Sequence, residues 1–255
     1  MPTMSRPDGV RIAYQLQGSV GRPGLLLTHG YGASSSMWRH NVPDLAHNRQ
    51  VLTWDIRGHG ASDAPDDPER YSHGACVEDM LALLDVAGLK RAVIGGMSLG
   101  GCLSLELYHR HPERALGLLL IDTGPGFANP EAREAWNRWA LDRAEDLDRQ
   151  GLAALPGGRE QREADHRHGA VGLAHAARGM LVQQDGAVLQ SLSDIAVPTL
   201  IVVGSEDQPF LAAAEVMHKR IPRARKIVLD GAGHAANLDA PTEFNAVVSE
   251  FLEEL

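Results

Sequence analysis

Short apolar runs alternate with longer segments of helical periodicity along most of this chain. The segment Val10–Leu16 alternates apolar and polar residues, as a half-buried strand does, whereas Ala115–Asp122 is mostly apolar, as a fully buried strand is. Within Cys76–Ala87, apolar residues recur every three or four positions, which is typical of an amphipathic helix. Further strands are predicted at Gly24–Thr28, Gln50–Asp55, Arg91–Gly95, Pro198–Val203 and Arg225–Leu229.

Predicted helices separate these strands in both the first and the last part of the chain. They cover Ser35–Ala46, Leu99–His111, Leu211–Arg220 and Pro241–Leu255, the last with a proline at its start. Strands that alternate with helices of this length favour a mostly parallel sheet with helices on both faces. The predicted fold class is therefore α/β.

The pattern changes between Thr123 and Ile195. A charged helix is predicted at Glu131–Gln150 and a second helix at Leu173–Gln184, with the polar, turn-rich segment Gly157–His168 between them. These helices are too apolar for a linker. We therefore predict an α/β core made of residues 1–123 and 196–255, and a small helical cap inserted at 124–195.

Composition narrows the choice of partners. The 255 residues suit one large domain, and 44% of them are hydrophobic, enough for a sizeable core. The net charge of −9, with no block of like charges, argues against nucleic acid and against a membrane surface as the main partner. We expect a small-molecule partner, and nothing in the sequence indicates an oligomeric state.

The cysteines and the N-terminal residues bear on location. Cys76 and Cys102 are too few for a disulfide framework, and we expect both to be reduced and buried. The first residues lack the apolar run of a secretory signal, and no run approaches the 18 apolar residues that cross a membrane. These features predict a cytoplasmic protein.

Polar residues with catalytic potential follow four of the predicted strands, in the loops 28–32, 96–100, 203–207 and 230–234. The carboxyl ends of parallel strands meet at one edge of a sheet, so one crevice can contain all four loops. In the second loop, Ser98 lies in a Gly-x-Ser-x-Gly sequence between a strand and a helix. Such a sharp turn lifts the serine hydroxyl out of the sheet, and its glycines leave room for the backbone.

Taken together, these motifs resemble those of the α/β-hydrolase superfamily over essentially the whole chain. Their order and spacing match that family, in which the nucleophile, the acid and the histidine follow one another along the chain. The matching motifs are His29-Gly30-Tyr31-Gly32, Asp55-Ile56-Arg57-Gly58-His59-Gly60-Ala61-Ser62-Asp63, Gly96-Met97-Ser98-Leu99-Gly100, Gly204-x-x-Asp207 and Gly233-His234.

The resemblance implies a Ser-His-Asp triad and no cofactor or metal. Ser98 is the expected nucleophile, and His234 is the expected base, because an imidazole takes and returns a proton near neutral pH. Asp207 is expected to orient the imidazole and to stabilise its charged form. The backbone N–H groups of Tyr31 and Leu99 are expected to form the oxyanion hole.

Other residues compete for some of these roles. Asp122 also ends a predicted strand, and some branches of the superfamily carry the acid there. We interpret His29 as a structural hydrogen-bonding residue of the oxyanion loop, and Asp55–Asp63 as a structural turn without a catalytic role. His166, His168 and His175 lack acidic or cysteine partners at ligand spacing, so we expect solvated side chains rather than a metal site.

The substrate pocket is expected to be apolar. Residues near the motifs supply its candidates, and the two tryptophans, three positions apart, can equally pin the cap to the core. The candidates are Met37, Trp38, Met97, Trp136, Trp139 and Phe210.

We therefore predict a serine hydrolase that cleaves carboxylic esters through an acyl-enzyme intermediate, a carboxylesterase-like enzyme. The alternatives on the same triad are a lactonase acting on enol-lactones, a carbon–carbon bond hydrolase, and a cofactor-free haloperoxidase or perhydrolase. A non-catalytic ligand-binding module is a further alternative, although a binding protein has no need of all three triad residues.

Overall fold

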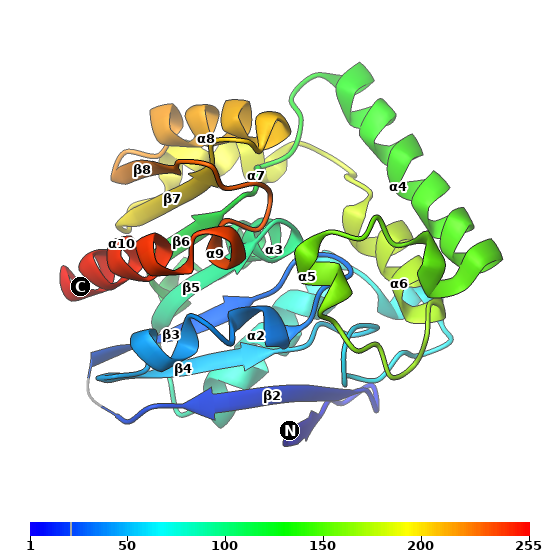
Figure 1. Cartoon of the computed structure of the whole chain (residues 1–255), viewed down its shortest axis with the longest axis horizontal. Helices are drawn as coiled ribbons and strands as arrows, with labels where there is room; N and C mark the ends of the chain where they lie inside the picture. The colour runs from blue at the N-terminus through cyan, green and yellow to red at the C-terminus, as the bar shows by residue number, and fades with distance from the viewer. Residues whose placement is uncertain (21) are drawn as a thin grey trace.

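The computed structural model describes residues 1–20 and 22–255, and in these residues eight strands form one sheet (Figure 1). The strand order is β1-β2-β4-β3-β5-β6-β7-β8. β1 and β2 pair antiparallel, β2 pairs antiparallel with β4, and all other neighbours are parallel. The strands are β1 (Thr3–Ser5), β2 (Arg11–Gln17), β3 (Arg22–Thr28), β4 (Arg49–Trp54), β5 (Ala92–Met97), β6 (Ala115–Ile121), β7 (Thr199–Gly204) and β8 (Ala224–Leu229). The prediction of a mostly parallel α/β sheet is confirmed.

Helices cover both faces of this sheet. The α-helices are α1 (Val42–Leu45), α2 (His73–Val86), α3 (Leu99–Arg110), α4 (Pro130–Gln150), α5 (Arg159–Arg162), α6 (Val171–Ala176), α7 (Ala187–Gln190), α8 (Gln208–Arg220), α9 (Ala236–Asp239) and α10 (Pro241–Glu253). Short 3-10 helices are η1 (Ser35–Trp38), η2 (Pro68–Arg70), η3 (Pro112–Arg114), η4 (Gly151–Ala154) and η6 (Ser191–Asp194), and η5 (Ala177–Leu181) is a π-helix.

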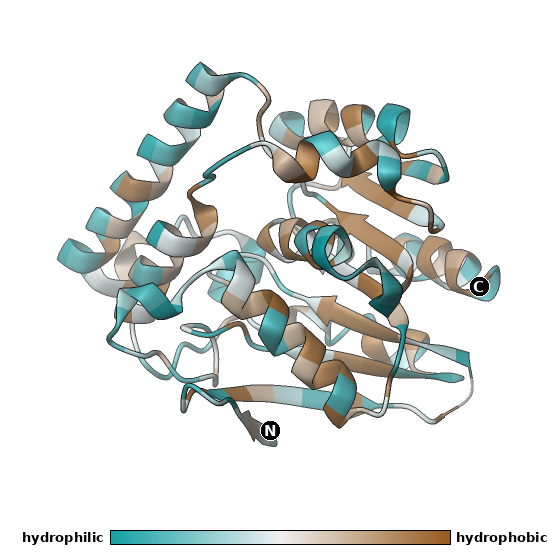
Figure 2. Ribbon diagram, turned by 180° about the vertical axis from the view of Figure 1, so that it is seen from behind, coloured by the Kyte–Doolittle hydropathy of each residue, from teal (hydrophilic) through white to brown (hydrophobic). Residues whose placement is uncertain are grey.

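The two faces of the sheet bury alternate residues of the same strands. Leu26 and Ile94 lie in one apolar cluster with residues of α2, α3 and α8, whereas Leu25 and Val93 lie in a second cluster with residues of α1 and α10. Successive side chains of a strand point to opposite faces, so a strand buried on both faces must be apolar at nearly every position. Figure 2 shows this concentration of hydrophobic residues in the strands.

Two predicted helices are interrupted. The segment Ser35–Ala46 forms η1 and α1 rather than one helix, because Pro43 is accommodated only in the first turn of a helix. Just before α1, the side chain of Asn41 donates to Asn237 O and Asn245 Oδ1. The segment Leu173–Gln184 is helical only to Leu181, first as α6 and then as the π-helix. A Cβ at Gly179 would lie 1.8 Å from Tyr71 O, so this π-turn packs directly against another stretch of backbone.

The topology decides where a site can form. From β3 the chain passes to β4 on one side of the sheet and later to β5 on the other, so β3 and β5 are neighbours whose following loops leave in opposite directions. Ligands of open α/β sheets bind at such a switch point, outside the carboxyl ends of the strands. Ser98 follows β5 and His29 follows β3, which places both at this point.

Helices α4–α7 lie in the chain between β6 and β7, and Figure 1 shows α4, α5 and α6 grouped beyond one end of the sheet. Tyr31 Oη, after β3, donates to Leu173 O in α6, and the N–H of Gly60, after β4, donates to His166. The inserted helices therefore contact the loops at the carboxyl ends of the strands. No helix in the described part of the chain is long and apolar enough to cross a membrane.

Candidate active site

Ser98 occupies a strained turn between β5 and α3. Its φ of 53° is uncommon for a residue with a side chain, and its N–H donates to Ile121 O at 2.9 Å. A Cβ at Gly96 would lie 2.3 Å from the backbone of Gly100, and a Cβ at Gly100 would lie 2.2 Å from Thr28 O. Only glycine fits at either position, which is the physical reason for the Gly-x-Ser-x-Gly spacing.

A chain of hydrogen bonds joins three of the predicted site residues. His234 Nδ1 lies 2.8 Å from Asp207 Oδ2, and His234 Nε2 lies 3.1 Å from Ser98 Oγ. The carboxylate accepts only, so Nδ1 carries the proton and Nε2 is left to accept from the serine hydroxyl. These three residues come from the loops after β5, β7 and β8, so the sheet assembles a group that is dispersed over 136 positions of the sequence.

Charge and exposure differ along this chain of hydrogen bonds. The side chain of Asp207 is 4% exposed, whereas that of His234 is 37% exposed and Ser98 is half-buried. Burial opposes the charged imidazolium, but the hydrogen bond and the negative charge of Asp207 outweigh it, so the pKa of His234 is raised. The serine and the imidazole are therefore accessible from solvent, while the carboxylate is not.

Asp122, the alternative acid, has a different role in the fold. Its carboxyl oxygens accept from the N–H groups of Gly204 and Ala236, each at 2.9 Å, while the ring of His234 is bonded to Asp207. Asp122 is fully buried at a φ of 43°, and burial raises its pKa to about 8. One carboxyl group thus connects the loop that carries Asp207 with the loop that carries His234.

The loop after β3 lies against the serine. A Cβ at Gly30 would lie 3.4 Å from Ser98 Cβ and 2.6 Å from Met97 Sδ, so the backbone there closely approaches the turn. The N–H groups of Tyr31 and Leu99 have no hydrogen-bond partner among the residues that the structure describes. Two unpaired N–H groups beside a serine hydroxyl are available to an anionic oxygen.

Hydrogen bonds with the buried side chains of His29 and Asp55 fix the backbone of this loop. His29 Nδ1 donates to Gly30 O at 2.7 Å, since its Nε2 accepts the N–H of Ile56 at 2.9 Å. Asp55 accepts from Ser35 N at 2.7 Å and from Ala61 N at 2.8 Å. Burial lowers the pKa of His29 to about 4, so its ring stays neutral.

The expectation of solvated histidines in the inserted segment is wrong for His166. Its exposed fraction is only 8%, and both ring nitrogens are hydrogen-bonded, Nδ1 to the N–H of Gly60 at 3.1 Å and Nε2 to Gly32 O at 3.0 Å. These partners lie 106 and 134 positions away, so no local pattern in the sequence reveals them. His168 is exposed, as predicted.

The predicted pocket residues lie in different surroundings. Phe210 stacks on His234 at 4.8 Å between ring centres, and Met97 contacts Gly30. Met37 and Trp38 are fully buried in the cluster that α10 covers. The rings of Trp136 and Trp139 in α4 are tilted by 39° and lie 4.7 Å apart between centres. Trp136 Nε1 donates to Leu181 O, and Trp139 is 42% exposed. Which of these positions contact substrate stays a prediction.

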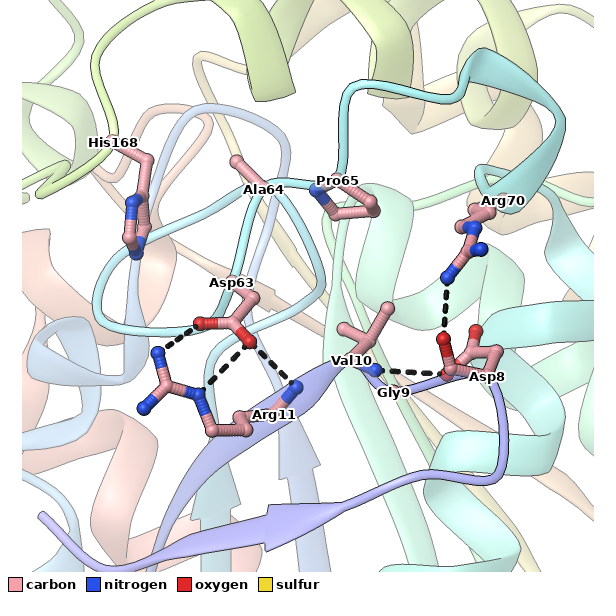
Figure 3. Close-up of a pocket in the computed structure, with 9 residues that line it drawn as sticks. All are labelled: Asp8, Gly9, Val10, Arg11, Asp63, Ala64, Pro65, Arg70 and His168. Carbon is pink, nitrogen blue, oxygen red and sulfur yellow. Dashed lines mark hydrogen bonds and ion pairs between the residues drawn. The ribbon is translucent and has the colours of Figure 1, made fainter.

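A shallow hollow of about 390 Å³ lies elsewhere, beside β2 (Figure 3). Its charged side chains already have partners: Arg11 binds Asp63 through two nitrogens, and Arg70 donates to the backbone oxygen of Asp8. Within residues 1–20 and 22–255, no group of three His, Cys, Asp or Glu side chains is arranged to hold a metal ion. Neither feature competes with the loops around Ser98.

Comparison with known proteins places this geometry in a family. Residues 23–172 match the family model described as the α/β hydrolase fold. The chain is 29% identical to the putative 2-succinyl-6-hydroxy-2,4-cyclohexadiene-1-carboxylate synthase of Bacillus subtilis over 97% of both chains. It is 27% identical to 3-oxoadipate enol-lactonase 1 of Acinetobacter baylyi, over 97% of this chain and 95% of that protein.

A solved structure agrees with these sequence relatives. The enol-lactonase from Burkholderia xenovorans LB400 superimposes with a TM-score of 0.79 and 26% identity, over 99% of this chain and 100% of that one. The family match spans more than half of the chain, and the fold, the turn at Ser98 and the order of the loops agree with it. The chain belongs to the α/β hydrolase fold family.

Proposed function

We propose that this protein is a serine hydrolase that cleaves carboxylic ester bonds through an acyl-enzyme intermediate. The observation that carries the proposal is the continuous contact from Asp207 through His234 to Ser98, at 2.8 and 3.1 Å. Both distances are within the reach that proton transfer between a nucleophile and its base requires. The accessible serine and the two unpaired N–H groups beside it supply the remaining parts of an acyl-transfer site.

The proposed reaction has two steps. In the first, Ser98 Oγ attacks the ester carbonyl carbon while His234 Nε2 takes the hydroxyl proton, and the carbonyl oxygen becomes an anion held by the N–H groups of Tyr31 and Leu99. The tetrahedral intermediate then breaks its bond to the alcohol oxygen, which leaves with the proton from His234. Asp207 stabilises the imidazolium while that proton is on the ring.

In the second step, water attacks the acyl-enzyme and gives up a proton to His234. The bond between Ser98 Oγ and the acyl carbon breaks, the serine regains its proton, and the carboxylic acid is released. The raised pKa of His234 suits a base that works near neutral pH, because such a base must accept a proton and return it in each step.

We propose that residues 124–195 form a cap over this site, and that the pocket lies between it and the core. The contacts of Tyr31 with Leu173 and of Gly60 with His166 support this placement. Of the six predicted pocket residues, Phe210 and Met97 are the two whose contacts lie at the triad and the oxyanion loop. Both are apolar, which favours an apolar group next to the scissile bond.

Lactone hydrolysis is the second candidate. A lactone is a cyclic ester, so the same two steps open it, and the acyl part then retains the alcohol as a hydroxyl group. The similarity in fold and sequence to the enol-lactonase from Burkholderia xenovorans supports this candidate.

The proposal is tested by labelling Ser98 and by measuring turnover. A fluorophosphonate should form an adduct on Ser98, located by mass spectrometry of the digested protein, and the Ser98→Ala variant should take up none. Initial rates over p-nitrophenyl esters of rising chain length, and over a panel of lactones, should identify the preferred class. Absence of an adduct in folded wild-type protein contradicts the enzyme proposal and favours a non-catalytic binding module.

A further inference from the structure

The segment 159–173 of the insertion lies directly on the oxyanion loop. Leu173 O accepts from Tyr31 Oη at 2.9 Å, and Glu163 O accepts from Ser36 Oγ at 3.2 Å. The carboxylate of Glu163 also pairs with Arg39. One short stretch of the insertion thus binds both ends of the loop that follows β3.

Three successive carbonyl groups of this loop accept hydrogen bonds from side chains. His29 Nδ1 donates to Gly30 O at 2.7 Å, Gln161 Nε2 donates to Tyr31 O at 3.4 Å, and His166 Nε2 contacts Gly32 O at 3.0 Å. His29 belongs to the core, whereas Gln161 and His166 belong to the insertion. The backbone on either side of the Tyr31 N–H is therefore fixed by both parts of the molecule.

The tautomer of His166 follows from its partners. The N–H of Gly60 can only donate, so Nδ1 of the ring must accept from it, at 3.1 Å. The ring proton is then on Nε2, which donates to Gly32 O. Burial lowers the pKa of His166, which keeps the ring in this neutral form.

The direction of the Tyr31 N–H depends on these bonds. In a trans peptide the carbonyl and the following N–H point in opposite directions, so the bond from His29 to Gly30 O turns the Tyr31 N–H away from His29. Gly32 has a φ of +70°, in the left-handed region that glycine adopts without steric cost. If His166 no longer donates to Gly32 O, the insertion loses one of its two hydrogen bonds to the carbonyl groups of this loop, and the backbone after Tyr31 is held less firmly.

We propose that His166 is a positioning residue for the oxyanion hole, through which the insertion fixes the Tyr31 N–H. This inference rests on the proposed function, because it assigns the Tyr31 N–H to the developing anion. His166 touches no reacting atom, and it acts through the carbonyl of Gly32. The insertion then contributes to transition-state stabilisation as well as to the walls of a pocket.

Two substitutions separate the two bonds of His166. In His166→Gln the side-chain amide reaches the place of Nε2 and can donate to Gly32 O, whereas in His166→Asn the amide lies near Nδ1 and can accept only from Gly60. We expect kcat to fall about 10- to 100-fold in His166→Asn with little change in KM, part of the 100- to 1000-fold loss on removing one oxyanion donor. His166→Gln should retain more of kcat, and the exposed His168→Asn should behave as wild type.

A transition-state analogue distinguishes positioning from simple loss of structure. A trifluoromethyl ketone forms a tetrahedral hemiketal with the serine, and its anionic oxygen mimics the oxyanion of the intermediate. Its inhibition constant should rise in parallel with the fall in kcat/KM. Affinity for the carboxylate product should not change. Equal losses in the Gln and Asn variants, in proportion to a lower melting temperature, overturn the inference.

Hydrogen exchange gives a readout that does not depend on activity. Ala33 N donates to Gly30 O within this loop, and Ser35 N donates to Asp55, which follows β4. The exchange rates of these two N–H groups therefore report how firmly the loop is held. Exchange at residues 30–36 should be faster in His166→Asn than in His166→Gln and wild type. Equal exchange in all three proteins overturns the inference, whereas faster exchange in His166→Asn without ester turnover by the wild type supports the anchoring and contradicts the proposed hydrolase.

Discussion

His234 and three other histidines lie at the same end of the sheet, and they differ in exposure, in hydrogen-bond partners and in the direction of their pKa shifts. The side chain of His234 is 37% exposed, has a carboxylate on Nδ1 and faces the Ser98 hydroxyl with Nε2, and its pKa is raised. His29, His59 and His166 are buried, contact backbone groups, and have lowered pKa values.

The difference teaches that the environment, not the residue type, decides which histidine can carry a proton. A buried imidazole without a carboxylate partner loses the solvation of its charged form, so it remains a neutral hydrogen-bonding unit. An imidazole beside Asp207 can accept a proton and keep it for the time of one chemical step. Both kinds of histidine lie at the end of the sheet where the loops after the parallel strands gather.

The sharpest way to break this comparison is to remove His234. We expect His234→Ala to lower kcat by a factor on the order of 10⁶, because the serine then has no base, and to leave the fold intact. Steady-state turnover of a p-nitrophenyl ester, with circular dichroism as the check on folding, measures this. Retention of more than a hundredth of the wild-type kcat would exclude His234 as the base.

A second experiment separates the two candidate acids. We expect Asp207→Asn to lower kcat by about 10⁴, because the ring of His234 loses the partner that fixes its tautomer. Asp122→Asn should lower kcat by about 10²-fold. The amide has one oxygen, so it can accept from only one of the N–H groups of Gly204 and Ala236, and the loops that carry them should shift. A larger loss in the Asp122 variant would make Asp122 the acid.

The pH dependence of kcat/KM in the same variants tests the direction of the pKa shift of His234. The acidic limb of kcat/KM reports the free enzyme's base, so its midpoint should lie above about 6.5 in the wild type, where Asp207 raises the pKa of His234. In Asp207→Asn that support is gone, and the midpoint should move to lower pH. A midpoint that stays in place would show that another group titrates.

The smallest expected effect is on the free energy of unfolding, which should depend on pH because of the buried histidines. A histidine whose pKa is lower in the folded than in the unfolded chain binds fewer protons when folded, so stability falls as the pH drops below about 6.5. With a folded pKa of about 4, His29 alone should lower the free energy of unfolding by about 2 kcal/mol between pH 7 and pH 5.

Urea unfolding at the two pH values measures this difference. His29→Gln should be less stable than wild type at pH 7 but should lose less stability on acidification. The matched control is His168→Gln, because His168 is exposed and its removal should leave the pH dependence unchanged. An identical pH dependence in wild type and His29→Gln would mean that His29 is not held neutral by the fold.

Much of the fold was predictable because it rests on local periodicity. The strands β3, β5, β6 and β7 are buried on both faces and therefore read as apolar runs. The break within 35–46 has a local signal, the proline at position 43, which a helix accommodates only in its first turn. The π-turn within 173–184 has no such signal, because Gly179 packs against Tyr71, more than 100 positions away.

The candidate site divides in the same way. Ser98, Asp207 and His234 were identified because each follows a predicted strand within a glycine-containing loop, and the topology of a parallel sheet brings such loops together. The bonds between Asp122 and the loops that carry Asp207 and His234, and the bonds of His166 to Gly32 and Gly60, were not visible in the sequence. Both consist of hydrogen bonds to backbone groups, and any residue type provides those groups.

The sequence by itself determined the α/β architecture, the order of the loops and the chemical groups that they carry, since periodicity and glycine requirements are local properties. Only the tertiary structure decided which carboxylate meets His234, which histidines are buried as neutral rings, and that the insertion is hydrogen-bonded to the loop after β3. These depend on distances between segments far apart in the chain, and burial and hydrogen-bond partners at those distances set each pKa and each role.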